Sequence, residues 1–225
     1  MSSISQTLPD EPSDLLILGA SRGIGAAAVE VALARGHAVR AFARSPEALK
    51  IEDPRLTRYA GDARSPDALR PAVAGADAVI YALGTPGTAR GPFGPRVTLH
   101  SEATRALIDV MREAGVRRLV AVTGYGAGES RLSMSLLERT AHRAALGRPY
   151  ADKDRQEALI RGCGLDWTIV RPTILRDAKA RGRYEVLLDA SEWRNGLISR
   201  ADVADFLVRR AEDREMLREA PVLAW

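Results

Sequence analysis

The sequence predicts an α/β fold in which helices cover both faces of a doubly wound, mainly parallel sheet. Short apolar runs alternate along the chain with longer stretches of helical periodicity, and this alternation is typical of parallel strands joined by crossover helices. The first apolar run, at 15–18, also passes directly into a turn with glycines at 19, 23 and 25. An apolar helical pattern follows at once. Strand, glycine turn and helix in this order form the first unit of a Rossmann-type sheet.

The other elements follow from the same patterns. The expected strands lie at 15–19, 38–43, 56–59, 78–83, 118–123, 167–171 and 196–199. The expected helices lie at 23–35, 66–74, 98–114, 151–162 and 200–212, with a further one near 131–145. Several of their ends carry capping signals. Gly36 and Gly115 resemble helix C-caps, Ser65 and Pro66 resemble an N-cap and a first-turn proline, and Ser199 precedes an acid at capping-box spacing.

Length and composition indicate a single domain. The chain has 225 residues, of which 46% are hydrophobic, and such α/β folds often reach about 250 residues without dividing. We expect a flexible N-terminal segment at 1–14 and one domain at 15–225. Two loops, at 84–97 and 124–150, leave the carboxyl edge of the sheet and are interpreted as walls of a substrate pocket. Ordinary surface loops are the alternative, because loop length alone does not show binding.

Charge and cysteine content argue against several classes of site. The formal net charge is +4, without a block of like charges or a basic stripe interleaved with aromatics, which favours a small anionic ligand over nucleic acid. The single cysteine, Cys163, allows no disulfide within the chain, and the histidines lack metal-ligand spacing. Of the histidines, His37 is expected on the surface and His142 is a weak acid–base candidate. We expect no metal.

The N-terminus carries no apolar signal-peptide segment, and no apolar run reaches the roughly 18 residues that span a bilayer. The expectation is therefore a cytoplasmic protein without a membrane partner, either a monomer or a small homo-oligomer.

The glycine turn predicts a dinucleotide site. Gly19 allows a tight turn, Gly23 lets the backbone approach a pyrophosphate, and Gly25 lets the helix pack closely on the sheet. The unpaired N–H groups at the helix start attract phosphates. The residues expected around the phosphates are Gly19, Ser21, Arg22, Gly23, Ile24 and Gly25. The alternative is a structural turn that binds nothing.

Arg44 follows the second expected strand, where an enzyme that selects NAD usually has an acid for the ribose 2′-hydroxyl. Arg22, inside the glycine turn, is placed to approach the same group. A guanidinium binds a 2′-phosphate through charge-assisted, bidentate hydrogen bonds. We therefore predict NADP(H) as the cofactor, with two solvated arginines as the alternative.

Seven segments form a characteristic set that extends over almost the whole chain, at 19–25, 44–47, 61–64, 78–84, 114–120, 164–173 and 198–204. In these segments the sequence resembles the atypical short-chain dehydrogenase/reductase group, in particular its NmrA-like and biliverdin reductase B (flavin reductase)-like NAD(P)H-binding members. The segments are specific for the superfamily, but not for a substrate.

The resemblance implies further cofactor contacts. It assigns the adenine to Asp62 and Ala63, the ribose to Leu83 and Gly84, the nicotinamide to Thr123, and the carboxamide to Pro172 and Thr173. For Asp62, a turn or capping role just before Ser65 is the alternative.

Lys153, Tyr150 and Thr123 are the catalytic candidates. Lys153 stands in a segment similar to the family's Lys-x-x-x-Glu, whose lysine hydrogen-bonds the nicotinamide ribose; a surface ion pair with Glu157 is the alternative. Ketone-reducing relatives have a tyrosine four residues before this lysine and a serine near the end of the fifth strand. Here Tyr150 precedes Lys153 by three residues and follows a proline, which suggests a helix start. Gly124 stands at the serine position, so Thr123 or Tyr125 is left as a hydroxyl donor.

These observations predict an NADPH-dependent reductase that transfers a hydride to a small planar or carbonyl acceptor, such as a flavin, quinone or ketone. Because the tyrosine–serine pair is incomplete, an acceptor that needs little acid catalysis fits better than a ketone. A non-catalytic NmrA-like NADP(H) sensor is one alternative. An NAD(P)-dependent isomerase, epimerase or lyase is another.

Overall fold

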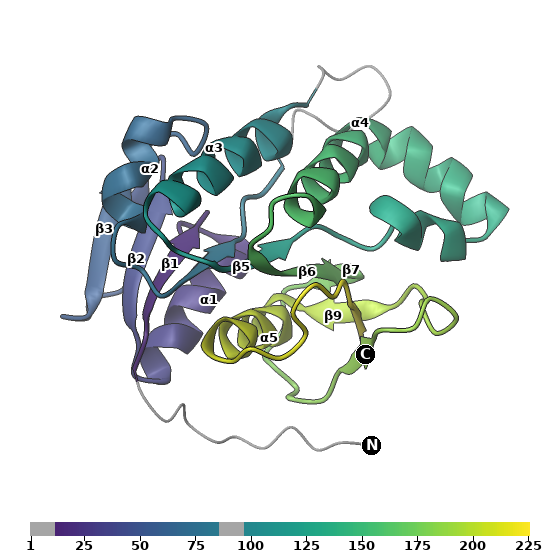
Figure 1. Cartoon of the computed structure of the whole chain (residues 1–225). Coiled ribbons are helices and arrows are strands. Elements are labelled where there is room, and N and C mark those ends of the chain that lie inside the picture. Colours follow the sequence, from purple (N-terminus) through teal and green to yellow (C-terminus); the bar gives the residue numbers. More distant parts are fainter. Residues whose placement is uncertain (1–11, 86–96) are drawn as a thin grey trace.

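The computed structural model describes residues 12–85 and 97–225, which form an eight-stranded sheet between two layers of helices (Figure 1). The strands of this sheet are β1 (Asp14–Leu18), β2 (Ala38–Ala43), β3 (Leu56–Ala60), β4 (Ala78–Tyr81), β5 (Arg118–Val122), β6 (Asp166–Pro172), β8 (Glu185–Leu187) and β10 (Val222–Ala224). Their order is β3-β2-β1-β4-β5-β6-β10-β8, and only β8, against β10, pairs antiparallel. The predicted Rossmann-type, doubly wound fold is confirmed.

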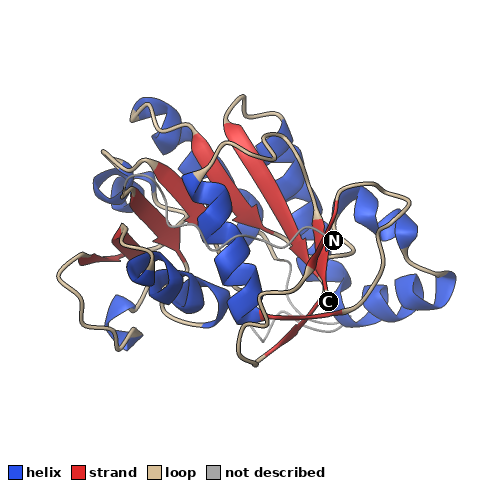
Figure 2. Ribbon diagram, turned by 90° about the horizontal axis from the view of Figure 1, so that it is seen from below, coloured by secondary structure: helices blue, strands red, loops and turns tan. Residues whose placement is uncertain are grey.

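The five α-helices of the described residues divide between the two faces of the sheet (Figure 2). They are α1 (Gly23–Ala34), α2 (Pro66–Val73), α3 (Leu99–Glu113), α4 (Leu136–Arg161) and α5 (Arg200–Glu212), with short 3-10 turns at Pro46–Ala48 and Gly128–Ser133. Leu16 and Leu18 belong to the core that includes α2 and α3, whereas Leu15 and Ile17 belong to the core that includes α1 and α5. All four leucine and isoleucine side chains are fully buried. Burial on both faces explains why this strand reads as an unbroken apolar run.

The helices expected near 131–145 and at 151–162 are one helix in the structure, so this part of the prediction is wrong. Ser135 starts α4 with a capping box to Glu138, and the helix continues through Pro149. An interior proline costs about 3 kcal/mol or more, and contacts between α4 and α3, among them those of Asp152 just beyond the proline, can offset this cost. Tyr150 therefore lies inside the helix and not at its start.

Three short strands escaped the sequence analysis. They are β7 (Ile174–Arg176), β8 and β10, each three residues long. The expected strand at 196–199 exists as β9 (Leu197–Ser199), but it pairs with β7 in a separate two-stranded sheet. Three residues are too few to show a period, so pairing with distant strands decides their conformation.

His37 is buried, which contradicts the expected surface position. Its Nδ1 accepts a hydrogen bond from the Ser13 main-chain N–H at 3.0 Å, so the proton is on Nε2, which donates to Glu212 Oε1 at 2.7 Å. The preceding glycine marks the end of α1 but does not determine which way the next side chain points. Here that side chain joins the start of β1 to the end of α5.

Candidate functional site

Two glycines of the turn after β1 lie so close to neighbouring backbone that a side chain is excluded at each of them. Gly19 has a φ of +83°, and a Cβ built on it would lie 2.6 Å from the Ala82 carbonyl oxygen. A Cβ on Gly25 would lie 2.2 Å from the Gly19 carbonyl oxygen. Arg22 precedes α1 in an extended conformation, and its side chain makes no cap to the helix. The first N–H groups of α1 thus remain open to an anionic ligand.

The turn lies against the end of β2, which brings the expected phosphate and adenosine residues to one corner of the sheet. The Gly19 N–H donates to the Phe42 carbonyl at 2.9 Å, and Arg44 follows two residues later with an exposed side chain. Asp62 follows β3 and accepts hydrogen bonds from the Arg64 main-chain N–H at 2.9 Å and from its guanidinium at 2.6 Å. Mainly through these bonds, and also through the charge of Arg44, the pKa of Asp62 falls to about 2.

This geometry is that of a turn stabilised by an aspartate side chain, in line with the alternative reading of Asp62. Its neighbour Ala63 is buried. The corner carries two exposed arginines, Arg22 and Arg44, and the carboxylate of Asp62 is bonded to a third, Arg64.

The segment after β4 continues the same edge. The Cα of Leu83 would lie 3.0 Å from a Cβ on Gly19, so Leu83 and Gly84 lie next to the glycine turn. Thr85 Oγ1 is 2.9 Å from His100 Nε2 on α3. Most of the expected pocket wall at 84–97 lies outside the described residues, and so does most of the N-terminal segment at 1–14.

Thr123, at the end of β5, contacts Lys153 and Glu157 of α4. Lys153 Nζ donates to the Thr123 carbonyl, and the Thr123 hydroxyl donates to Glu157 Oε1 at 2.7 Å. The one proton of this hydroxyl is therefore already engaged, and the side chain is almost fully buried. Burial lowers the pKa of Lys153 to about 8.

Glu157 is not a surface partner of Lys153, because it is buried and binds Arg171 of β6. Arg171 donates from Nε to Oε1 at 3.0 Å and from Nη2 to Oε2 at 2.6 Å, and its side chain is fully buried. Glu129 contacts the same Nη2 at 3.0 Å. This pair was not predicted from the sequence, although an arginine within the apolar run 167–172 is a detectable signal, since a buried charge needs a partner.

Asp152 is a second residue that the sequence analysis missed. It is fully buried on α4 and accepts a hydrogen bond at 2.7 Å from the His100 main-chain N–H at the start of α3, where the Thr98 side chain provides no cap. Its carboxylate thus caps a neighbouring helix. This contact holds α4, and with it Lys153, in place.

The hydroxyl of Tyr150 occupies the space beside Gly124. A Cβ on Gly124 would lie 2.6 Å from Tyr150 Oη and 3.5 Å from Lys153 Nζ. The Tyr150 ring packs edge-on against His142, with centroids 4.1 Å apart, and Lys153 Nζ is 5.1 Å from the Tyr150 centroid. Burial raises the pKa of Tyr150 to about 12, so this hydroxyl keeps its proton at neutral pH.

The hydroxyl of Tyr125, the other donor considered, is 3.0 Å from Ser133 Oγ. Pro172 and Thr173 follow Arg171 and are buried, and the Thr173 hydroxyl donates to the Leu223 carbonyl at 3.0 Å. The turn, the ends of β2 to β6 and one face of α4 all lie along the carboxyl edge, and they make up the candidate site.

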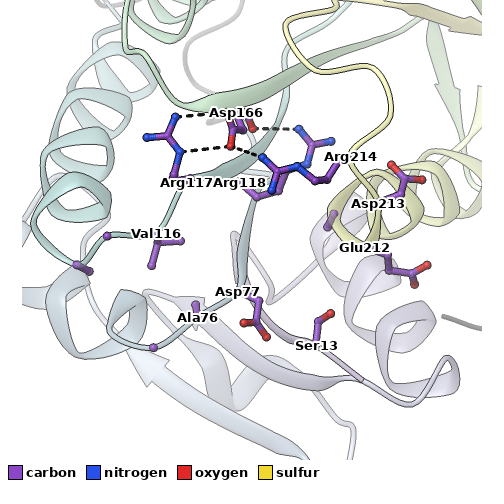
Figure 3. Close-up of a pocket in the computed structure, with 14 residues that line it drawn as sticks. Ser13, Ala76, Asp77, Val116, Arg117, Arg118, Asp166, Glu212, Asp213 and Arg214 are labelled. Atoms are coloured by element: carbon purple, nitrogen blue, oxygen red, sulfur yellow. Dashed lines mark hydrogen bonds and ion pairs between the residues drawn. The ribbon is translucent and has the colours of Figure 1, made fainter. Parts of the chain in front are cut away.

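A hollow of about 490 Å³ lies at the opposite, amino edge (Figure 3). Asp166 there accepts hydrogen bonds from Arg117 and from Arg214, at 3.4 and 3.0 Å. These charged side chains satisfy one another, and the glycine turn lies at the other end of the strands. Since open parallel sheets bind ligands outside the carboxyl ends of their strands, the carboxyl edge is the candidate functional site.

In residues 12–85 and 97–225, no helix combines the length and apolar character needed to cross a membrane. The same ranges contain no cluster of three histidine, cysteine or acidic side chains suited to a metal ion.

Known proteins resemble this chain in sequence and in fold. The sequence model of a family described as NAD(P)H-binding matches residues 19–214. The fold is similar to that of ChuY, an anaerobillin reductase from Escherichia coli O157:H7, with a TM-score of 0.79, 25% identity, and coverage of 94% of this chain and 97% of that one.

Two curated relatives are similar in sequence. The 3-beta-hydroxysteroid dehydrogenase of Mycolicibacterium neoaurum is 32% identical over 120 residues, which are 51% of this chain and 32% of that protein. The uncharacterized sugar epimerase YhfK of Bacillus subtilis is 25% identical over 150 residues, which are 67% of this chain and 64% of that protein. The chain thus matches about a third of the length of the first relative and less than two thirds of the second.

Proposed function

Because this chain belongs to the NAD(P)H-binding family, we propose that it is an NADPH-dependent reductase of the atypical short-chain dehydrogenase/reductase type. The observation that carries the proposal is the cradle formed by the glycine turn, the uncapped start of α1 and the arginines at its corner. Gly19 and Gly25 let the turn pack closely on Ala82 and on α1, and a Cβ on Gly23 would meet nothing nearer than 4.0 Å, so the backbone at Gly23 can contact a diphosphate directly. NADPH, when bound there, supplies the hydride.

The choice of NADPH over NADH rests on Arg44 and Arg22. Both side chains are exposed next to the turn, and no acid follows β2 at the position where a ribose 2′-hydroxyl is usually recognised. Arg64 is already bonded to Asp62, which leaves Arg44 and Arg22 to bind a 2′-phosphate. Asp62, Ala63, Leu83 and Gly84 then line the adenosine half of the cofactor.

In the proposed reaction, Lys153 and Tyr150 are the residues that contact the nicotinamide ribose and the acceptor. Lys153 orients the nicotinamide ribose through its ammonium group, which the Thr123 carbonyl holds in place. Tyr150 Oη holds the proton that the reduced acceptor receives, since it lies beside Gly124 and next to Lys153. Thr123 acts as a positioning residue, because its hydroxyl proton is donated to Glu157. Pro172 and Thr173 line the carboxamide end.

The acceptor in this proposal is a flavin, quinone or ketone, and the reaction takes place in the cytoplasm. The second candidate function is an isomerisation in which the enzyme keeps its nicotinamide cofactor bound, because the relative YhfK is named as an epimerase. In that case NADPH would bind without net consumption.

The test follows NADPH consumption by absorbance with a panel of flavins, quinones and ketones. We expect turnover with at least one acceptor class, and we expect Tyr150→Phe to lower kcat about 100-fold while leaving the NADPH affinity unchanged. Tyr125→Phe is the matched control, because its hydroxyl contacts Ser133 instead. Tight NADPH binding without consumption across the panel would overturn the reductase assignment and favour the sensor or the epimerase.

A further inference from the structure

Arg200, the first residue of α5, lies directly against the glycine turn. A Cβ built on Gly23 would be 4.0 Å from both Cδ and Nε of Arg200. α1 and α5 lie side by side on one face of the sheet (Figure 1), so the start of one helix meets the start of the other. In the described part of the chain, no other atom outside the turn and the start of α1 lies within 4 Å of that Cβ position.

The backbone of Arg200 is held firmly, whereas its guanidinium is bound only at the surface. Ser199 is buried and caps α5, accepting from the Asp202 N–H at 2.9 Å and donating to Asp202 Oδ2 at 2.7 Å. The Arg200 guanidinium is bonded from Nη1 to Asp177 Oδ1 at 2.6 Å, and the Asp177 side chain is 88% exposed. An exposed ion pair of this kind contributes little to stability, so the guanidinium can exchange it for another partner.

We propose that Arg200 is a pyrophosphate-binding residue, whose guanidinium leaves Asp177 and binds the cofactor diphosphate beside Gly23. The inference rests on the proposed dinucleotide site and extends it by a residue from the far end of the sequence. A diphosphate that approaches the Gly23 backbone comes within reach of Arg200, and its two charges recruit the guanidinium more strongly than one solvated carboxylate does.

The position of Arg200 separates its role from that of Arg44. The diphosphate is common to NADPH and NADH, whereas the 2′-phosphate occurs only in NADPH. Arg200 therefore contributes equally to the binding of both cofactors, and it contributes nothing to a ligand without a diphosphate.

The test measures the affinities of NADPH, NADH and adenosine 2′-monophosphate by titration calorimetry. Arg200→Ala is expected to weaken both dinucleotides by the same factor, about tenfold, as the loss of a charge-assisted hydrogen bond implies. Binding of the monophosphate stays unchanged. Asp177→Ala removes the competing carboxylate and is expected to strengthen NADPH binding a few-fold. Arg183→Ala, which removes an exposed arginine from the same part of the chain, is the control and changes none of the three affinities.

Other outcomes overturn the proposal in distinct ways. If Arg200→Ala affects NADPH alone, the residue binds the 2′-phosphate; if Asp177→Ala weakens binding as much as Arg200→Ala, the ion pair is structural. If the wild-type chain binds both dinucleotides and Arg200→Ala changes neither, the inference fails alone. If the wild-type chain binds neither dinucleotide, the proposed function fails with it.

Discussion

Replacing Glu157 by glutamine should destabilise the fold strongly, because it leaves the buried Arg171 charge with a poorer partner. The carboxylate accepts three hydrogen bonds, from the Thr123 hydroxyl at 2.7 Å and from Arg171 at 3.0 and 2.6 Å. The Arg171 and Glu157 side chains are 0% and 3% exposed. In glutamine, an amide NH₂ replaces one of the two oxygens that now face the guanidinium.

Removing one partner of a buried ion pair costs about 3–5 kcal/mol. Glu129 still contacts Arg171 Nη2 at 3.0 Å from a side chain that is 45% exposed, so we expect the lower end, about 3 kcal/mol. For a chain of this length that loss corresponds to a fall in Tm of about 6–12 °C. Urea unfolding followed by circular dichroism measures the free energy of unfolding directly.

Two further variants separate the ion pair from general damage to the site. Glu129→Gln should cost about 1 kcal/mol or less, because that carboxylate is half exposed. Replacing both Glu157 and Arg171 by leucine and methionine should recover much of the loss, since no buried charge is then left unpaired. A loss below about 1 kcal/mol for Glu157→Gln would refute the reasoning.

Two other predictions concern the nicotinamide end of the site. Burial lowers the pKa of Lys153 from 10.5 to about 8, so its ammonium group loses a proton as the pH rises through about 8. The NADPH affinity, measured by fluorescence titration, should fall over that range. Lys153→Met should abolish this pH dependence. The same shift makes stability rise between about pH 8 and 10.5, since the unfolded chain still holds the proton that the folded chain has lost. Gly124→Ser should lower turnover at least tenfold, on the order of 1.4 kcal/mol, because its Cβ would lie only 2.6 Å from the Tyr150 hydroxyl and would displace it. Unchanged steady-state kinetics would show that Tyr150 does not hold the transferred proton.

The central strands could be predicted because burial on both faces makes them continuous apolar runs, as in Leu15–Leu18. The strands at the far edge could not, because Val222–Ala224 becomes a strand only by pairing with β6 and β8. The proline at 149 misled the prediction for a related reason. Its local preference suggests a helix start, but α4 already starts at Leu136 with a capping box, and its part after the proline is bonded to α3 through Asp152.

In the candidate site, the residues that could be predicted are those recognised by their spacing within a sequence motif, such as Gly19, Gly25 and Lys153. Arg200 is not among them, since its closeness to Gly23 depends on how α1 and α5, which are far apart in the sequence, pack together. The occupied hydroxyl of Thr123 also needs three dimensions to be seen, because its partner Glu157 is on another element.

The most direct test of the account is to measure NADPH and NADH affinities of the wild-type chain and of Arg44→Asp side by side. The exposed guanidinium beside the glycine turn should make the wild-type chain prefer NADPH. The substitution should weaken NADPH binding about 100-fold, as loss of a charge-assisted bidentate contact and gain of a repelling carboxylate imply, and should leave NADH within about twofold. Equal losses for both cofactors, or no change in either, would contradict the assignment of this corner of the sheet to the 2′-phosphate.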